Sequence, residues 1–160
     1  MNEQEQMFLS LLEKHKQIIY KVCFMYASDS ESIDDLFQEV TLNLWKAFPR
    51  FRGESKTTTW VYRIAINTCV SWLRLSDRQP QTIPLTVPMS DLMADEQERE
   101  NLRELYTLIN RLGKSERALI LLWLEERSYE EIAETLDISI SNVGVRINRI
   151  KAKLKNMSNN

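Results

Sequence analysis

The 160-residue sequence has few of the residues that build catalytic or metal centres. It contains one histidine, His15, and two cysteines, Cys23 and Cys69. Both cysteines fall within apolar helical patterns, which favours two buried free thiols over a disulfide or a metal pair. The sequence shows no cluster of metal ligands and no nucleophile beside a general base. It therefore predicts no catalytic site, no metal site and no bound cofactor, and we expect the protein not to be an enzyme.

Long apolar runs are also missing. No run is long enough to span a bilayer, and the first residues, Met1 to Glu5, are acidic, unlike a signal peptide. We therefore expect a cytoplasmic protein without direct membrane insertion.

Charge of one sign does not dominate the chain, whose formal net charge is −2. The charges are segregated instead: acids crowd into residues 29–39, 91–104 and 125–137, and bases into 46–56 and 146–155. A chain with this distribution can present a basic surface to nucleic acid and an acidic surface to a protein.

Strand-type alternation is absent as well, and the sequence predicts an all-α fold with two small helical domains. The N-terminal domain spans residues 1–75. Its apolar periodicity predicts helices over 3–27 and 33–48, with Pro49 ending the second, and a third helix that follows the threonines at 57–59 and runs through about residue 75. Three aromatic residues of the third helix are expected to pack in the core: Trp60, Tyr62 and Trp72.

Residues 76–94 differ in kind from the rest. They contain Pro80, Pro84 and Pro88, and proline at this density favours extended backbone over helix. We interpret this segment as a linker. A C-terminal domain follows over residues 95–160.

The C-terminal domain ends in a predicted helix-turn-helix. Ser128 and Glu131 have the spacing of a capping box, and residues 137–139 suit a turn. Ser139 or Ser141 can cap the next helix, which carries an apolar stripe and a basic remainder without acids. That pattern is typical of a helix that enters a DNA major groove. The alternative is an amphipathic helix with a solvated basic face.

Four motifs in order resemble the extracytoplasmic-function (ECF) group of bacterial sigma factors. They are Asp-Asp-Leu-Phe-Gln-Glu-Val-Thr-Leu-Asn-Leu-Trp at residues 34–45, Phe-Arg-Gly-Glu-Ser at 51–55, Thr-Trp-Val-Tyr-Arg-Ile-Ala-Ile-Asn-Thr at 59–68 and Ser-Tyr-Glu-Glu-Ile-Ala at 128–133. The resemblance implies a sigma factor that directs bacterial RNA polymerase core to promoters and helps to open them. It implies promoter DNA and core polymerase as partners, and no small-molecule substrate.

The resemblance also implies residue roles. The second helix of the family docks on polymerase, and the matching positions are Asp35, Gln38, Glu39 and Trp45. Taken alone, this acidic helix face would favour a solvated surface over a binding site. The residues that match the −10 recognition and melting module are Phe51, Arg52, Gly53, Ser55, Lys56, Arg63 and Asn67. Thr57 departs from the family, which usually has an aromatic residue there.

For the −35 element, the resemblance points to the last helix. The candidates for base contact are Ser141, Asn142, Arg146, Asn148 and Arg149, while Lys151 and Lys153 are expected on phosphates. Gly144 stands where relatives commonly carry arginine, and Asp137 stands where such turns usually carry glycine.

Two other interpretations stay open on the sequence alone. One is a helix-turn-helix regulator that binds palindromic duplex DNA as a dimer, without polymerase. The other is a helical adaptor whose basic tail touches nucleic acid nonspecifically. Many ECF factors are held inactive by an anti-sigma protein, so the resemblance adds such a protein as a candidate partner.

Overall fold

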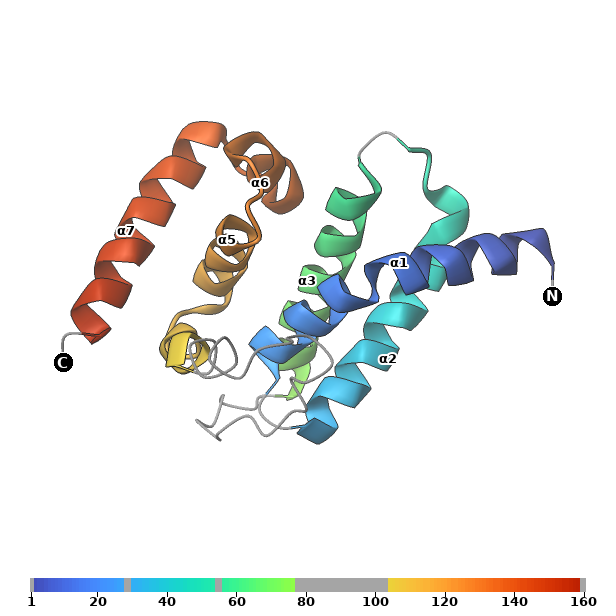
Figure 1. Cartoon of the computed structure of the whole chain (residues 1–160), viewed down its shortest axis with the longest axis horizontal. Helices are drawn as coiled ribbons and strands as arrows, with labels where there is room; N and C mark the ends of the chain where they lie inside the picture. Colours follow the sequence, from blue (N-terminus) through green and yellow to red (C-terminus); the bar gives the residue numbers. More distant parts are fainter. Residues whose placement is uncertain (1, 28–29, 54–55, 77–103, 159–160) are drawn as a thin grey trace. The chain divides into compact units, whose positions relative to one another are not determined.

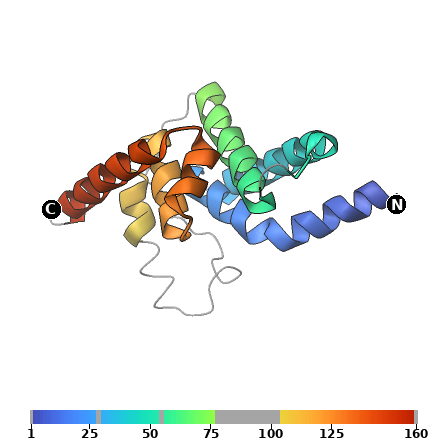
Figure 2. The same cartoon turned by 90° about the horizontal axis from the view of Figure 1, so that it is seen from above.

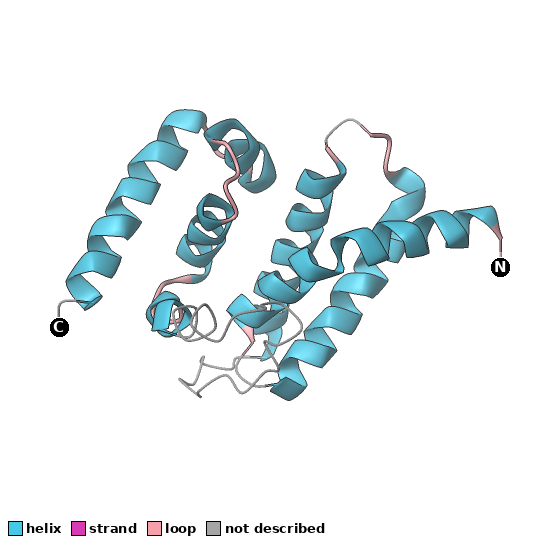
Figure 3. Ribbon diagram, in the orientation of Figure 1, coloured by secondary structure: helices cyan, strands magenta, loops and turns pink. Residues whose placement is uncertain are grey.

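A computed structural model describes residues 2–27, 30–53, 56–76 and 104–158. The chain divides into two compact units, Met1–Gln79 and Pro80–Asn160, and all secondary structure in the described residues is helical (Figure 1, Figure 3). The predicted all-α fold with two domains is confirmed. Apart from Ser76, residues 76–94 lie outside the described part of the chain, although the division between the units falls within them. None of the described helices combines the length and apolarity needed to cross a bilayer.

The first unit consists of α1 (Glu3–Tyr26), α2 (Ser30–Ala47), the 3-10 helix η1 (Phe48–Arg50) and α3 (Thr57–Ser76). A capping box starts α1: the Asn2 side chain accepts from the Glu5 amide at 2.8 Å, and the Glu5 carboxylate accepts from the Asn2 amide. Helices α2 and α3 run antiparallel, and α1 packs against both (Figure 1). Helix α2 begins three residues before the predicted start at Ile33.

The core of this unit forms where the three helices meet. Cys23 and Cys69 are buried free thiols, as predicted. A hydrogen bond to Cys23, together with burial, raises the pKa of the Cys69 thiol well above its ordinary value, so it stays protonated. Trp60 and Tyr62 are buried as expected, whereas Trp72 is only half-buried. The prediction of a core position for Trp72 is therefore wrong in part, since its ring lies at the edge of a groove.

The second unit contains a helical stretch over residues 104–109, then α5 (Lys114–Leu124), α6 (Tyr129–Leu136) and α7 (Ile140–Ser158). Helices α5, α6 and α7 each pack on the other two (Figure 2). The interior is apolar, with Leu119, Leu122, Ile132, Val143 and Ile147 almost completely buried.

Within residues 104–158, Arg117 is the buried charged residue, with only 3% of its surface exposed. Its Nε donates to the Leu112 carbonyl at 3.1 Å and its Nη2 to the Asn110 carbonyl at 2.9 Å. These carbonyls belong to the turn that joins residues 104–109 to α5, where a helix end leaves acceptors unsatisfied. One guanidinium therefore holds the turn closed.

Two short turns set the geometry of the last helices. Ser128 and Glu131 form the predicted capping box at the start of α6, with Ser128 Oγ accepting from the Glu131 amide at 3.1 Å. Asp137 ends α6 in the left-handed conformation, with φ at 56°. Aspartate tolerates this conformation better than most residues, so the turn keeps the geometry that glycine usually supplies. Ser139 then caps α7 by accepting from the Asn142 amide at 3.1 Å.

Candidate functional site

One face of α2 combines acidic and apolar side chains. Asp35, Gln38 and Glu39 are exposed, while Leu36, Val40 and Leu44 on the opposite face are fully buried. Leu42 and Trp45 continue the exposed face at helical spacing, with 44% and 36% of their surface exposed. The sequence prediction did not include Leu42, although its position three and four residues after Glu39 and Gln38 could have found it.

Trp45 is held in place by α1. Its ring lies edge-on to that of Phe8, with the centroids 5.0 Å apart, and Phe8 also meets Phe48 at 5.5 Å. Aromatic pairs in this geometry hold each other in fixed orientations. The apolar end of the α2 face is therefore a rigid surface, suited to contact with a protein partner.

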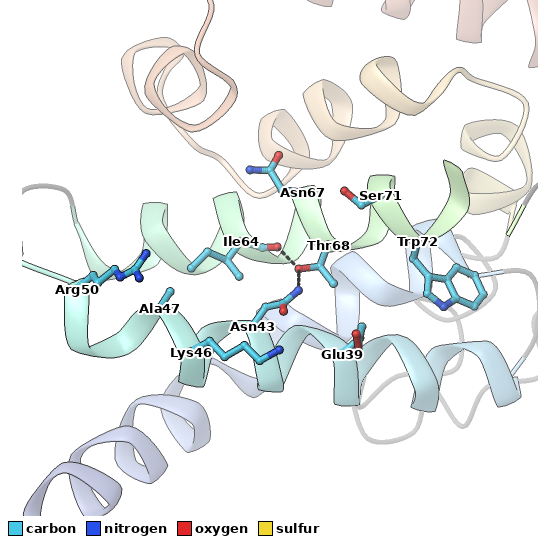
Figure 4. Close-up of a pocket in the computed structure, with 10 residues that line it drawn as sticks. All are labelled: Glu39, Asn43, Lys46, Ala47, Arg50, Ile64, Asn67, Thr68, Ser71 and Trp72. Carbon is cyan, nitrogen blue, oxygen red and sulfur yellow. Dashed lines mark hydrogen bonds between the residues drawn. The ribbon is translucent and has the colours of Figure 1, made fainter. Parts of the chain in front are cut away.

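A groove of about 610 Å³ runs between α2 and α3 (Figure 4). Asn43 Nδ2 donates to Thr68 Oγ1 at 2.9 Å, and Thr68 donates to the Ile64 carbonyl at 2.7 Å, which ties the two helices together. Glu39, a predicted polymerase contact, and Asn67, a predicted reader of the −10 element, both line this groove, one on each helix. Sequence reasoning missed its other polar lining residues, Asn43, Lys46, Arg50, Thr68 and Ser71.

The segment after η1 carries the predicted −10 residues. Phe51 is half-buried, with its ring centroid 4.6 Å from that of Trp60. Arg52, Gly53 and Lys56 are exposed, and Gly53 adopts φ of 72°, which suits glycine. Ser55 lies outside the described residues. An anchored aromatic flanked by exposed cations is the combination that binds single-stranded nucleic acid.

Helix α3 supplies the remaining two predicted −10 residues. Asn67 is exposed and projects from α3 on the side away from α2 in Figure 4, whereas Arg63 is half-buried. Thr57, which stands where the family usually has an aromatic residue, is the half-buried first residue of α3. Phe51 and Phe48 supply the aromatic contacts to Trp60 at this end of the helix.

Helix α7 turns an apolar stripe inward and a polar face outward. Val143, Ile147 and Ile150 are buried, and the stripe packs on α5 and α6. The predicted base-contacting residues are exposed, except Asn142, which is half-buried and has its backbone amide capped by Ser139. The exposed ones are Ser141, Arg146, Asn148 and Arg149. A basic helix presented in this way at the end of a tight turn fits a major groove.

Comparison with known proteins covers both units. Residues 11–79 match the Sigma-70 region 2 family, and residues 102–154 match Sigma-70 region 4. The ECF RNA polymerase sigma-E factor of Escherichia coli K12 is 32% identical, with 79% of this chain and 74% of that protein covered. The ECF RNA polymerase sigma factor SigX of Bacillus subtilis is 30% identical, with 87% and 77% covered. The chain belongs to the ECF sigma factors. The function predicted from the sequence, direction of RNA polymerase to promoters, is thereby confirmed, and a polymerase-independent regulator is not favoured.

Solved structures agree on the fold of this sigma factor. The structure of CnrH in complex with the cytosolic domain of CnrY matches with a TM-score of 0.72 at 20% identity, covering 97% of this chain and 89% of that one. The sigma factor RpoE in complex with the anti-sigma factor NepR from Bartonella quintana matches with a TM-score of 0.71 at 20% identity, covering 97% and 96%.

The two lysines predicted on phosphates have partners within the sigma factor. Lys151 Nζ lies 4.1 Å from the centroid of the Trp123 ring, and Lys153 Nζ lies 3.1 Å from Oε1 of Glu116. Partial burial raises the pKa of Glu116, but the Gly113 amide and Lys153 outweigh this and leave it lowered. Both lysines thus attach α7 to α5. A contact with phosphate would have to replace these partners.

Gly144 sits where α7 meets α6. A Cβ on Gly144 would lie 3.4 Å from Cε2 of Tyr129, which is ordinary van der Waals contact. The glycine is therefore not required by crowding, and it lowers the stability of a helix interior by about 0.5–1 kcal/mol relative to alanine.

We expect Gly144→Ala to raise the free energy of unfolding of the second unit by about 0.5–1 kcal/mol, because the methyl group restricts the unfolded chain and meets only the Tyr129 ring. Urea unfolding of the full chain measures this change in the free energy of unfolding. Ala152→Gly, at an exposed position of the same helix, is the inverse control and should lower stability by a similar amount. A loss of stability in Gly144→Ala would show that the Tyr129 ring cannot accept the methyl.

Proposed function

We propose that this sigma factor docks on bacterial RNA polymerase core through the exposed face of α2, and that each unit contacts one promoter element. The N-terminal domain, residues 1–75, recognises and helps to melt the −10 element. The C-terminal domain, residues 95–160, reads the −35 element as duplex DNA, and residues 76–94 link the two. The exposed face of α2 carries the proposal, because its acidic and apolar residues are presented together on a fully packed helix.

Docking uses Asp35, Gln38 and Glu39 for charge and hydrogen bonding, with Leu42 and Trp45 as apolar contacts. Exposed apolar residues beside charges are the usual composition of a protein interface whose centre is desolvated on binding. We infer that the protein itself catalyses no reaction and acts in the cytoplasm, where core polymerase engages the chromosome.

Opening of the −10 element requires a place for unpaired bases. Phe51 and its neighbours form an aromatic platform, and Arg52 and Lys56 supply exposed cations for phosphates. Asn67 offers an amide that can pair with a base edge, and Gly53 gives the loop its turn. Ser55 and Arg63 complete the proposed set.

The −35 element is read by α7. Arg146, Asn148, Arg149 and Ser141 present hydrogen-bonding groups on its outer face, and Asn142 lies at its N-terminal edge. Lys151 and Lys153 meet phosphates by exchanging their contacts with Trp123 and Glu116.

An anti-sigma protein is a further proposed partner. The solved structures of CnrH and of RpoE of Bartonella quintana, which share this fold, hold the cytosolic domain of CnrY and the anti-sigma factor NepR. A protein that covers the exposed face of α2 would compete with polymerase for it.

Promoter-directed transcription with bacterial core polymerase, with and without the protein, tests the proposal. We expect transcription from a subset of genomic promoters only when the protein is present. No stimulation on any genomic promoter, together with tight binding to a palindrome in the absence of core, would replace the proposal with a dimeric regulator.

A narrower prediction concerns Arg149. Arg149→Ala should weaken transcription from a promoter with the preferred −35 sequence by about tenfold or more, and from one with a scrambled −35 sequence much less. The reason is that a bidentate base contact contributes about 1–3 kcal/mol of discrimination. Lys155→Ala removes one charge from the same helix and is the control. Equal losses on both promoters would assign Arg149 to the DNA backbone.

A further inference from the structure

Val145 is an exposed apolar residue on the outer face of α7, with 48% of its surface exposed; Ile140, exposed to 51%, is the first residue of the helix and lies off that face. Successive residues of an α-helix are about 100° apart, so Val145 lies opposite the stripe formed by Val143, Ile147 and Ile150. Ser141 and Arg149 stand one turn before and after it on the same face. Val145 therefore occupies the middle of the surface on which the proposed base contacts are arranged.

A β-branched apolar residue is a poor choice for a solvated helix position. It lowers helix propensity and leaves apolar surface in water, where lysine or glutamate would serve better. Its neighbours on the same face are polar or basic: Ser141, Arg146, Asn148 and Arg149. A partner that covers this side chain would remove its apolar surface from water.

The surroundings of Val145 let a partner come close. Gly144 beside it has no side chain, and the Tyr129 ring lies over that position from α6, itself 38% exposed. The Tyr129 ring covers the backbone at Gly144, and position 144 adds no side chain of its own beside Val145.

Major grooves offer one apolar group to such a side chain. Among the four base pairs, only those containing thymine display a C5 methyl, and the other exposed edges donate or accept hydrogen bonds. A valine held at the middle of a reading face would discriminate by this methyl, while Ser141, Asn148 and Arg149 supply the hydrogen bonds around it.

We propose that Val145 reads the C5 methyl group of a thymine in the −35 element, and that this contact sets part of the promoter specificity of this sigma factor. The inference rests on the proposed role of α7 in −35 recognition. It adds a specificity-determining residue, and it names the chemical group that the residue recognises.

Single-methyl changes in the DNA test the inference. Holoenzyme is assembled from the full chain and core polymerase and bound to a promoter fragment whose −35 element has been located by protection. Each thymine of that element, on either strand, is replaced in turn by deoxyuridine, which lacks only the methyl. We expect one replacement to weaken binding about fourfold, the effect of one buried methyl-sized group.

The Val145→Ala variant, combined with the deoxyuridine changes, completes a double-mutant cycle between protein and DNA. It should bind the thymine promoter about fourfold less tightly and should be insensitive to deoxyuridine at that same position. Replacing the thymine by cytosine should weaken binding. Using 5-methylcytosine at that position should restore part of the binding of the unmodified protein, and none of the binding of Val145→Ala. Leu124→Ala, which trims an apolar residue of α5 that is 39% exposed, should change nothing.

Three results would overturn the inference. If no deoxyuridine distinguishes the two proteins while both still prefer the −35 sequence over a scrambled one, Val145 reads no methyl and the −35 role of α7 stands. If Val145→Ala weakens binding equally on every probe, the residue contacts polymerase or the DNA backbone. If the unmodified holoenzyme does not prefer the −35 sequence, the proposed −35 function itself fails.

Discussion

Alanine substitution of Asp35, Gln38 and Glu39 together is expected to abolish co-purification of this sigma factor with RNA polymerase core. The three side chains are exposed on α2 beside Leu42 and Trp45, and none belongs to the buried stripe of that helix. Truncating one partner of a desolvated charge pair costs a complex about 2–5 kcal/mol. The loss of two carboxylates and one amide would therefore weaken binding by about a thousandfold or more.

Two controls separate docking from folding. Helicity and thermal unfolding of the triple variant should match those of the unmodified protein, because exposed substitutions change stability by only about 0.5 kcal/mol. Glu13→Ala combined with Lys16→Ala removes an exposed ion pair of α1, whose atoms lie 2.8 Å apart, and should leave co-purification intact. Retained binding of core by the triple variant would place the docking surface elsewhere.

Arg117→Met is expected to cause the largest loss of stability among single substitutions in the second unit, about 3 kcal/mol. The change removes the donors that satisfy the carbonyls of Asn110 and Leu112, and each buried acceptor left without a partner costs about 1–3 kcal/mol. Methionine fills most of the space, so the measured loss reports the hydrogen bonds more than a cavity. Arg117→Lys should recover little, because an ammonium group cannot reproduce the planar fork.

Urea unfolding of the full chain gives the free energy for this comparison. Arg111→Met makes the same chemical change at an exposed position of the turn and should cost less than about 0.5 kcal/mol. Similar losses in the two variants would mean that the buried guanidinium contributes no more than a surface one.

The helices were predictable from the sequence because their ends carry chemical signals. The capping box of Ser128 and Glu131 marks the start of α6, Pro49 follows the end of α2, and the apolar periodicity locates the helix interiors. Helix α2 begins at Ser30, earlier than predicted, because polar residues at a helix start do not contribute to the apolar period that located it. The sequence offered Ser139 and Ser141 as equivalent N-cap candidates. The structure selects Ser139, whose Oγ accepts a hydrogen bond from the Asn142 amide.

The parts that escaped prediction depend on contacts between elements. Arg117 looks like a solvent-facing residue in a helix, and its burial follows from a turn that closes over it. The meeting of Tyr129 and Gly144 joins two helices, so no local pattern contains it. Lys151 and Lys153 matched the family as phosphate ligands, yet their contacts to Trp123 and Glu116 require knowledge of how α7 lies on α5.

Lys151 and Trp123 also give this protein an optical reporter. Trp123 is the one tryptophan of the four in the sequence that belongs to the second unit, since Trp45, Trp60 and Trp72 fall within the first. Indole fluorescence responds to a nearby ammonium charge, and here that charge sits 4.1 Å above the ring on the helix proposed to read DNA. A difference spectrum between the unmodified protein and Trp123→Phe would isolate the emission of this residue. Engagement of α7 with a promoter could then be followed in solution without any attached dye.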